Sequence, residues 1–363
     1  MRLNKKGLSN AAVVLIIAIC VAVVAVGAYM AFFESDDDGT TEVQGKIGLV
    51  LATGGLGDRS FNDQSFWAAE DGVEDFDFEL DHVEPDSVAE FETYQRQFAR
   101  EEEYDLIVCV GFDQAAALEN VASDYPDQDF AIVDGHVEGA NNVASLLFND
   151  WEEAFLAGVV AGEMTETNKI GIEGGMDIDL INNFVMGYRQ GALWTNSEMG
   201  ENDVIVKYVG DWSDVTTGKA LAEDMYDDGA DIIYGSAGRS HLGVFESAEE
   251  RSDALAIGTD VDQAWSAPEY SDVIIASALK RVDVSVYDQI DRKANDEFEP
   301  GVYNYGMAPD SVGVGTGIAI GEENINEYIR SSASEVEIPD EVIDKVEEAV
   351  EKIRDGTIEI DHL

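Results

Sequence analysis

Short apolar runs alternate with amphipathic stretches of helical spacing from Lys46 to the C-terminus. The apolar runs are rich in Val, Ile and Leu, and near-continuous apolar strands are typical of parallel sheets that helices cover on both faces. The predicted strands are 46–52, 78–85, 105–111, 129–135, 142–148, 169–175, 203–210, 231–238, 254–260 and 272–280. The predicted helices are 63–76, 88–103, 112–126, 150–165, 178–194, 214–227, 240–251, 281–295 and a last helix that begins near Pro339. We therefore expect an α/β fold.

The strand pattern starts twice, because the tripeptide KIG opens both the run at Lys46 and the run at Lys169. This repetition suggests two similar doubly wound lobes, and 363 residues are enough for two domains of ordinary size. In such sheets, ligands bind at the carboxyl ends of the strands. The segments that follow the predicted strands are 53–63, 111–114, 134–136, 174–178, 210–214, 235–241, 260–265 and 278–280.

The N-terminal region has the pattern of a membrane segment. Residues 11–33 carry no charge, and about 20 apolar residues suffice to cross a bilayer. Basic residues precede this run and acidic residues follow it, which places the N-terminus inside the cell. We expect 1–10 to be a cytoplasmic basic segment, 11–33 a transmembrane anchor or signal helix, and 34–45 an acidic linker to an extracellular domain. Cleavage after Gly7, in the pilin-like sequence KKGLS, is an alternative that keeps the apolar helix.

The charge balance limits the partners of the chain. The formal net charge is −55, with 76 acidic residues against 21 Lys and Arg. A nucleic-acid partner is disfavoured, because phosphate binding needs a basic surface. The frequent aromatic and β-branched residues argue against disorder. The composition instead indicates a folded protein of a halophilic archaeon, in which salt screens the repulsion within about 3 Å at 1 M.

The stretch GGLGDRSFND, Gly54 to Asp63, follows the first predicted strand and raises three possibilities. A phosphate cradle of the P-loop type needs a Lys and a Ser or Thr after the glycines, and a dinucleotide fingerprint needs a glycine where Ser60 stands. Asp58 would also repel a phosphate. Catalysis is disfavoured because no histidine of the chain forms a recognisable pair with a Ser or Cys nucleophile. No cluster has convincing spacing for a metal, and no cofactor is expected.

Reversible binding fits the residue types best. Phe61 offers a flat face to a ring, and Asn62 offers both a donor and an acceptor. Asp134 and Asp260 each end a strand, where a carboxylate accepts hydrogen bonds from ring N–H groups or sugar hydroxyls. The alternative for each Asp is capping of the next helix, and Asp63 is as suited to that task as to any contact with ligand. Aromatic stacking, carboxylates and the single cation Lys280 suit a neutral nucleoside better than a nucleotide.

Long motifs in the same order resemble the basic membrane protein family of ABC-transporter solute-binding proteins, which are similar to bacterial purine-nucleoside receptor lipoproteins. The resemblance covers residues 46–358. The motifs that carry it, besides GGLGDRSFND, are VGF at 110–112, DFAIVDG at 129–135, NVASLLFNDWEEAFLAGVVAG at 142–162, KIGIEGG at 169–175, FVMGYRQGA at 184–192, YVGDWSD at 208–214, IGTDVDQ at 257–263 and SALKRVDVSVYD at 277–288.

The resemblance implies a type I periplasmic-binding-protein fold, in which two lobes joined by three crossovers close on a ligand by hinge motion. The lobes implied are 46–149 with 261–296, and 150–260 with 297–363. It implies no enzymatic activity but capture of nucleosides, purine nucleosides first, and delivery to an ABC permease.

The family's site can be carried over to matching positions. Phe61 is then expected to stack on the base, and Asn62 with Asp134 to bond its edge. Asp260 is expected to bind the ribose hydroxyls. The other expected ligand-binding residues are Lys280, Gly238 and, as a second stacking aromatic, Tyr234. The sequence departs from the family at AGRSHLG, where relatives have a glycine-rich turn, and Arg239 and His241 there are candidates for a changed ligand preference.

Two other functions are compatible with such a fold. A sensory binding protein would report the ligand to a signalling partner, and the fold alone does not separate this role from transport. A nucleoside-processing enzyme would need an aspartate metal cluster near the start of the domain, which the sequence lacks. A transcription regulator would need a basic helix-turn-helix domain, which residues 1–45 cannot form.

Overall fold

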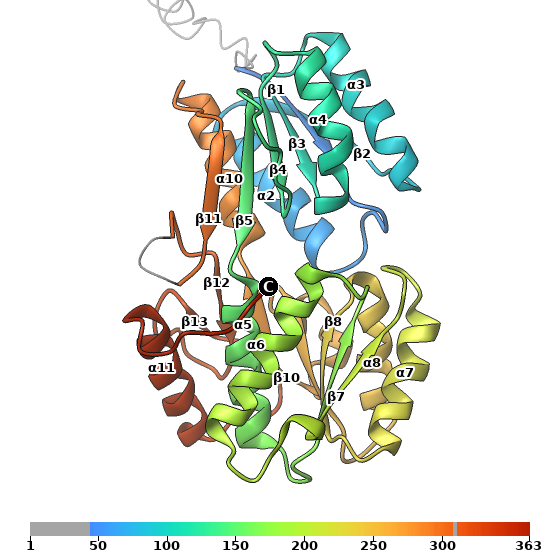
Figure 1. Cartoon of the computed structure of the whole chain (residues 1–363), viewed down its shortest axis with the longest axis vertical. Coiled ribbons are helices and arrows are strands. Elements are labelled where there is room, and N and C mark those ends of the chain that lie inside the picture. The colour runs from blue at the N-terminus through green and yellow to red at the C-terminus, as the bar shows by residue number, and fades with distance from the viewer. Residues whose placement is uncertain (1–43, 308–310) are drawn as a thin grey trace, which may run out of the picture. The chain divides into compact units, whose positions relative to one another are not determined.

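The computed structural model describes residues 44–307 and 311–363. Two β-sheets run through these residues, and helices cover each sheet on both faces (Figure 1). The expected membrane segment 11–33, with Gly7 and the linker before Gln44, lies outside the described residues. No helix within the described ranges is both long and apolar enough to span a bilayer.

The first sheet is parallel throughout, and its central strands are buried on both faces, as the continuous apolar runs predict. Its strands lie in the order β2 (Phe78–Val83), β1 (Gly45–Val50), β3 (Leu106–Val110), β4 (Phe130–Val133), β5 (Val143–Phe148) and β11 (Gly301–Tyr305). The helices that cover it are α2 (Phe61–Asp75) and α10 (Val282–Ala294) on one face, and α3 (Phe91–Glu101) and α4 (Ala115–Asp124) on the other.

The second sheet repeats this arrangement, except that its strand β12 is antiparallel to β10. Its strands lie in the order β7 (Val204–Tyr208), β6 (Ile170–Gly174), β8 (Ile232–Ser236), β9 (Leu255–Asp260), β10 (Ile274–Lys280), β12 (Thr316–Ala319) and β13 (Ile329–Arg330). The helices are α5 (Asp150–Met164), α6 (Asp179–Thr195) and α11 (Asp340–Arg354) on one face, and α7 (Val215–Asp227) and α8 (Leu242–Glu249) on the other. A short helix, α9 (Gln263–Ser266), follows β9.

The two lobes share one strand order. In each, the second strand lies outside the first, and the third, fourth and fifth follow on the other side. The two KIG tripeptides correspond to β1 and to the start of β6. This confirms the two similar lobes inferred from the repeated pattern, and it places a reversal of strand order between β1 and β3 and between β6 and β8. Ligands bind at such reversals.

The expected lobe boundaries were wrong in two places. Strand β10 lies in 261–296, which was assigned to the first lobe, but it pairs with β9 in the second sheet, and only α10 returns to the first. Strand β11 lies in 297–363, which was assigned to the second lobe, but it pairs with β5 in the first sheet. The pattern of apolar residues predicts where a strand lies in the chain, but not which other strands it pairs with. Strand β13 escaped prediction because it has only two residues, and β11 because it is mostly exposed and shows no apolar run.

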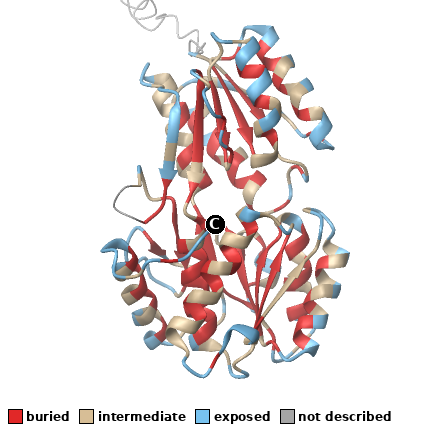
Figure 2. Ribbon diagram, in the orientation of Figure 1, coloured by how far each residue is buried: buried red, intermediate tan, exposed pale blue. Residues whose placement is uncertain are grey.

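Helices α5 and α6 pack unusually closely because glycines line their contact. A Cβ added to Gly158 would lie 2.0 Å from the carbonyl oxygen of Tyr188, and one added to Gly191 would lie 2.0 Å from that of Phe155. Figure 2 shows the strands buried and the outward helix faces exposed. Since the N-terminal ends of α5 and α6 both reach the edge of the sheet, this packing fixes the side chains presented there.

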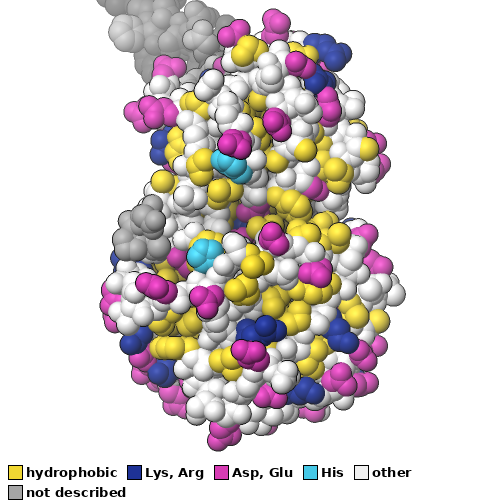
Figure 3. All heavy atoms as spheres, viewed as in Figure 1, with side chains coloured by type: hydrophobic (Ala, Val, Ile, Leu, Met, Phe, Trp, Pro, Cys, Tyr) yellow, Lys and Arg dark blue, Asp and Glu magenta, His cyan; other side chains and the backbone are white. Residues whose placement is uncertain are grey.

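The acidic residues gather on the surface. Figure 3 shows Asp and Glu side chains scattered over the visible face, with far fewer Lys and Arg between them. Several of these cations are engaged by carboxylates, for example in the pairs Arg251 with Asp227 and Lys293 with Asp129. Much of the excess negative charge therefore lies where solvent can screen it.

Candidate ligand-binding site

A cavity of about 90 Å³ lies where the carboxyl ends of strands from both sheets face each other. The first lobe contributes side chains from the segments after β1, β3 and β4, and the second contributes the ends of β8, β9 and β10 together with α6. The lining residues used below are Asp58, Phe61, Asn62, Phe112, Asp113, Asp134, Phe184, Trp212, Gly238, Arg239, Asp260 and Lys280. Among the expected site residues, Tyr234 does not line this cavity.

The loop from Gly54 to Asp63 is held by its own carboxylates. Asp58 accepts hydrogen bonds from the backbone N–H groups of Ser60, Asn62 and Asp63, at 3.0, 2.8 and 3.2 Å. It therefore caps the start of α2, a task for which Asp63 was the candidate. Asp63 instead accepts from the N–H groups of Gly57 and Arg59. These bonds place Phe61 on the cavity wall at the first residue of α2.

The side chain of Asn62 is engaged within the same loop. Its Oδ1 accepts from the Ala52 N–H at 2.9 Å, and its Nδ2 donates to Asp58 at 3.1 Å. One amide hydrogen and the second lone pair of Oδ1 remain for a ligand. The bonds within the loop join it to the end of β1, and the base-edge role of Asn62 stays a prediction.

Asp134 and Asp260 have the same unusual backbone conformation at the ends of β4 and β9. Their φ angles are +59° and +66°, a left-handed region that Asp tolerates better than most residues. Neither caps a helix. Asp134 Oδ2 accepts from Lys280, and Asp260 Oδ2 accepts a short hydrogen bond from the Ser60 hydroxyl of the opposite lobe. Local strain that persists at a cavity is a sign of function.

Lys280 lies at the centre of the site and is almost fully buried. Its Nζ is 2.6 Å from Asp134 Oδ2 and 2.9 Å from Asp150 Oδ1. It also approaches the ring centroids of Phe61 at 5.6 Å and Phe184 at 5.5 Å. Burial alone would lower the pKa of Lys280, but the surrounding carboxylates raise it above its usual value. Lys280 is therefore a charged group whose charge is already balanced within the protein.

One carboxylate oxygen of Asp134 has no partner in the protein. Its Oδ1 is buried without a hydrogen bond, and Asp134 is among the residues that line the cavity. A buried acceptor without a partner costs about 1–3 kcal/mol, and a donor on a bound molecule would remove that cost. Asp260 is a second carboxylate that lines the cavity. Burial raises the pKa of Asp260 to about 6, while Lys280 and Ser60 hold it down.

Tyr234 does not line the cavity, although it was the expected second stacking aromatic. It is fully buried and packs against Tyr188 with ring centroids 5.3 Å apart, and its hydroxyl lies 3.2 Å from Thr259 Oγ1. The aromatic side chains that the second lobe brings to the cavity are Phe184 and Trp212. Both lie in motifs quoted above, FVMGYRQGA and YVGDWSD, and Trp212 lies in a segment directly after a predicted strand. Its position after a predicted strand was the signal by which Trp212 could have been found in the sequence.

The turn AGRSHLG, residues 237–243, contributes some residues to the cavity lining and others to the core. Gly238 has φ +55°, and a Cβ there would lie 3.1 Å from the Trp212 carbonyl oxygen, so glycine suits the position. Arg239 is exposed and borders the cavity. His241 does not reach it. His241 is fully buried beside Gln263, with 2.7 Å between their side-chain nitrogens, and burial lowers its pKa to about 3.

Two further acids lie beneath Lys280 on the first turn of α5. Burial and the neighbouring Asp134 raise the pKa of Asp150 to about 7, against the lowering effect of Lys280. Glu153 is fully buried, and neither carboxyl oxygen has a hydrogen-bond partner. Burial, and then the charge of Asp150, raise the pKa of Glu153 well above its usual value. Glu153 is therefore expected to keep its proton to a higher pH than an exposed glutamate does.

Replacing Glu153 with Gln is expected to stabilise the protein increasingly as pH rises. In the wild type the folded state holds a proton that the unfolded state releases, so the free energy of unfolding falls as pH rises through the interval between the two pKa values. Gln keeps the shape and removes this dependence. Urea unfolding from about pH 5 to about pH 8 should show a difference in the free energy of unfolding between variant and wild type that grows by up to about 1.4 kcal/mol per pH unit.

The control is Glu119→Gln, on the exposed face of α4, which should leave the pH dependence of the free energy of unfolding as in the wild type. A constant difference would contradict a raised pKa of Glu153.

Comparison with known proteins gives a consistent result. The family model Bmp, described as ABC transporter substrate-binding protein PnrA-like, matches residues 46–357. An uncharacterized lipoprotein of Pyrococcus abyssi is 34% identical over 318 residues, which cover 85% of this chain and 78% of that protein. The ABC transporter nucleoside-binding protein BmpA of Lactococcus lactis is 32% identical over 310 residues, or 79% of this chain and 86% of that protein. The crystal structure of an ABC transporter solute-binding protein of Aeropyrum pernix matches with a TM-score of 0.74 at 29% identity, over 88% of this chain and 93% of that one.

Proposed function

Since the chain belongs to the Bmp family of ABC transporter substrate-binding proteins, we propose that it captures nucleosides, purine nucleosides first, in the cavity between its lobes. The observation that carries this proposal is the pairing of a buried free acceptor, Asp134 Oδ1, with the aromatic faces of Phe61 and Phe184 at one cavity. A purine offers N–H donors at its edge and a flat ring between such faces. The nucleoside-binding relative of Lactococcus lactis supports the same ligand class.

Each wall of the cavity has a task in this proposal. Phe61 stacks on the base from the first lobe, and Phe184 takes the place on the second lobe that Tyr234 was expected to fill. Asp134 accepts a hydrogen bond from the base, and Asp260 accepts from the ribose hydroxyls. A phosphate is disfavoured by the charge balance of the lining. The carboxylates of Asp58, Asp113, Asp134 and Asp260 face one exposed cation, Arg239, while the charge of Lys280 is balanced by its own partners.

Binding requires the lobes to move apart. The cavity of about 90 Å³ is smaller than the roughly 300–1,000 Å³ of ordinary small-molecule sites. The three connections between the lobes, after β5, β10 and β11, are then the hinge, and the ligand enters before they close.

The remaining proposals concern where the protein works and which partners it has. The apolar segment 11–33 anchors the protein in the cell membrane with the binding domain outside, where it delivers its ligand to the permease subunits of an ABC transporter. The name of the Pyrococcus abyssi relative, a lipoprotein, supports a membrane attachment. The net charge of −55 suits a protein that works in concentrated salt.

Thermal unfolding of the purified chain with candidate ligands tests the ligand class. A nucleoside at 100 times its Kd should stabilise the protein by about 2.7 kcal/mol, whereas the corresponding monophosphate, free ribose and amino acids should have little effect. The proposal would be wrong if sugars or amino acids stabilised the protein and nucleosides did not. Free base released during incubation would show an enzyme instead.

Replacing Phe61 with Ala should weaken nucleoside binding about 10- to 100-fold, because stacking of a base on an aromatic side chain contributes about 1–3 kcal/mol. Isothermal titration measures the change. The matched control is Phe66→Ala on the same helix, since Phe66 packs against His82 and does not border the cavity. Equal losses in the two variants would show that Phe61 supports the fold of α2 rather than the ligand.

A further inference from the structure

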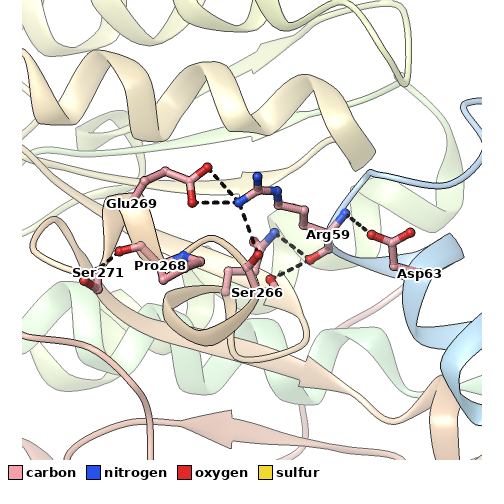
Figure 4. A network of polar contacts seen from close by, with 7 residues as sticks. Arg59, Asp63, Ser266, Pro268, Glu269 and Ser271 are labelled. Carbon is pink, nitrogen blue, oxygen red and sulfur yellow. Dashed lines mark hydrogen bonds and ion pairs between the residues drawn. The ribbon is translucent and has the colours of Figure 1, made fainter.

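We propose that Arg59 is a positioning residue, which fastens the ligand-binding loop of the first lobe to the second lobe and holds the two lobes closed. Figure 4 shows the contacts. The guanidinium Nη1 of Arg59 lies 2.7 Å from the carboxylate of Glu269 and donates to the carbonyl oxygen of Ser266 at 3.2 Å. In return, the Ser266 hydroxyl donates to the carbonyl oxygen of Arg59 at 2.8 Å.

The two sides of this contact belong to different lobes. Arg59 lies between β1 and α2 of the first lobe, whereas Ser266 ends α9 and Glu269 lies in the next turn, between β9 and β10 of the second sheet. No connection between the lobes passes through either segment. The contact of Arg59 with Ser266 and Glu269 can therefore break and form again as the lobes move, because neither segment is part of the hinge.

Arg59 is held in a costly conformation to make this contact. Its φ is +56°, which is uncommon for a residue other than glycine. The N–H of Arg59 donates to Asp63 at 2.9 Å, which fixes the turn. Such strain is retained when the surrounding structure imposes it and is often part of a function.

The residues that follow Arg59, in the loop and in α2, make further contacts with the second lobe. The next residue, Ser60, donates to Asp260 at the cavity, and Gln64 Nε2 lies 3.4 Å from the carbonyl oxygen of Asp260. About one turn beyond Gln64, Trp67 meets Trp265 of α9 edge to face, with ring centroids 5.5 Å apart. Closing these contacts brings Phe61, which lies between them, to its place on the cavity wall. Closure and positioning of the aromatic ring are then one event.

The contact is strong enough to bias closure and weak enough to open. The side chains of Arg59 and Glu269 are 37% and 47% exposed, and exposed ion pairs are weak and are screened by salt. A protein that must release its ligand needs such a reversible contact. The effect on closure should therefore decrease as the salt concentration rises.

Spin labels test the proposal without any ligand. Labels at Glu119→Cys on α4 and Glu249→Cys on α8, both exposed, report the distance between the lobes in the full-length chain with Cys20 changed to Ser, since Cys109 is buried. We expect Arg59→Ala to increase the population at long distances relative to the wild type. Exchanging the charges, with R59E and E269R together, should restore the short distance.

The control is Arg251→Ala, which removes an ion pair of similar exposure to Asp227 inside the second lobe and should leave the distances unchanged. The proposal is overturned if Arg59→Ala leaves the distances as in the wild type, or if the charge exchange does not reverse its effect.

The consequence for ligand rests on the proposed nucleoside function. Arg59→Ala should raise the rate of nucleoside dissociation by about two- to fivefold at low salt. If no nucleoside binds to the wild type, the proposed ligand is wrong, while the distance measurement still decides the role of Arg59.

Discussion

Replacing Lys280 with Met is expected to lower the free energy of unfolding by about 3–5 kcal/mol, as breaking a buried ion pair does. Lys280 is the cation that balances Asp134 and Asp150, at 2.6 and 2.9 Å, and all three side chains are almost fully buried. Without it, two carboxylates remain in a medium of low polarity with no opposite charge. Urea unfolding at neutral pH measures the loss.

The pH dependence separates this cause from a simple packing defect. Burial already raises the pKa of Asp150 to about 7 against the lowering effect of Lys280. Without the cation that lowering effect is gone, so protonation of Asp150 at lower pH removes a buried charge and the loss of stability should shrink. Adding Asp150→Asn to Lys280→Met should likewise recover part of the loss. The matched control is Lys293→Met, because Lys293 pairs with Asp129 in a partly exposed position, where about 1 kcal/mol or less is expected. A loss for Lys280→Met that is small, or equal at all pH values, would contradict the central role of this cation.

The sequence predicts those elements of the fold whose burial is visible in their own residues. Parallel strands buried on both faces appear as continuous apolar runs, so β1 to β10 and the longer helices between them were recognisable from their residues alone. The four-residue helix α9 was not predicted. Lobe membership was not recognisable. Strand β10 pairs with its neighbour in the chain, β9, so the chain crosses to the first lobe only after Lys280, and no residue of the strand itself marks that crossing. Strand β11 pairs with β5, which lies far away in the chain. The short strand β13 has too few residues to show any period.

The site was predictable where a residue lies directly after a strand. Asp134, Asp260 and Lys280 end strands of the two sheets, and topology alone brings strand ends together. Tyr234 was misplaced because it lies inside a strand, where alternation sends successive side chains to opposite faces, and its face is the core. Phe184 lies on a helix, and only the packing of α6 on α5 brings it to the cavity.

Replacing Gly191 with Ala is expected to lower the free energy of unfolding by about 2 kcal/mol or more, as overpacking of a well-packed contact does. Helix propensity predicts the opposite sign, because Ala is favoured over Gly in a helix by about 1 kcal/mol. The added Cβ would lie 2.0 Å from the carbonyl oxygen of Phe155, which is backbone and cannot rotate away. The helices α5 and α6 must therefore separate. Urea unfolding measures the change.

The same separation should reach the ligand site, because α6 carries Phe184 and α5 begins with Asp150. Nucleoside affinity is then expected to fall together with stability, although Gly191 itself does not border the cavity. The control is Gly200→Ala, where the nearest atom to an added Cβ is a side-chain oxygen at 3.6 Å, and neither property should change. If Gly191→Ala were as stable as the wild type, close contact of the two helices would not be what sets the position of Phe184. If stability fell and affinity did not, the ring of Phe184 would be held by the sheet rather than by α5.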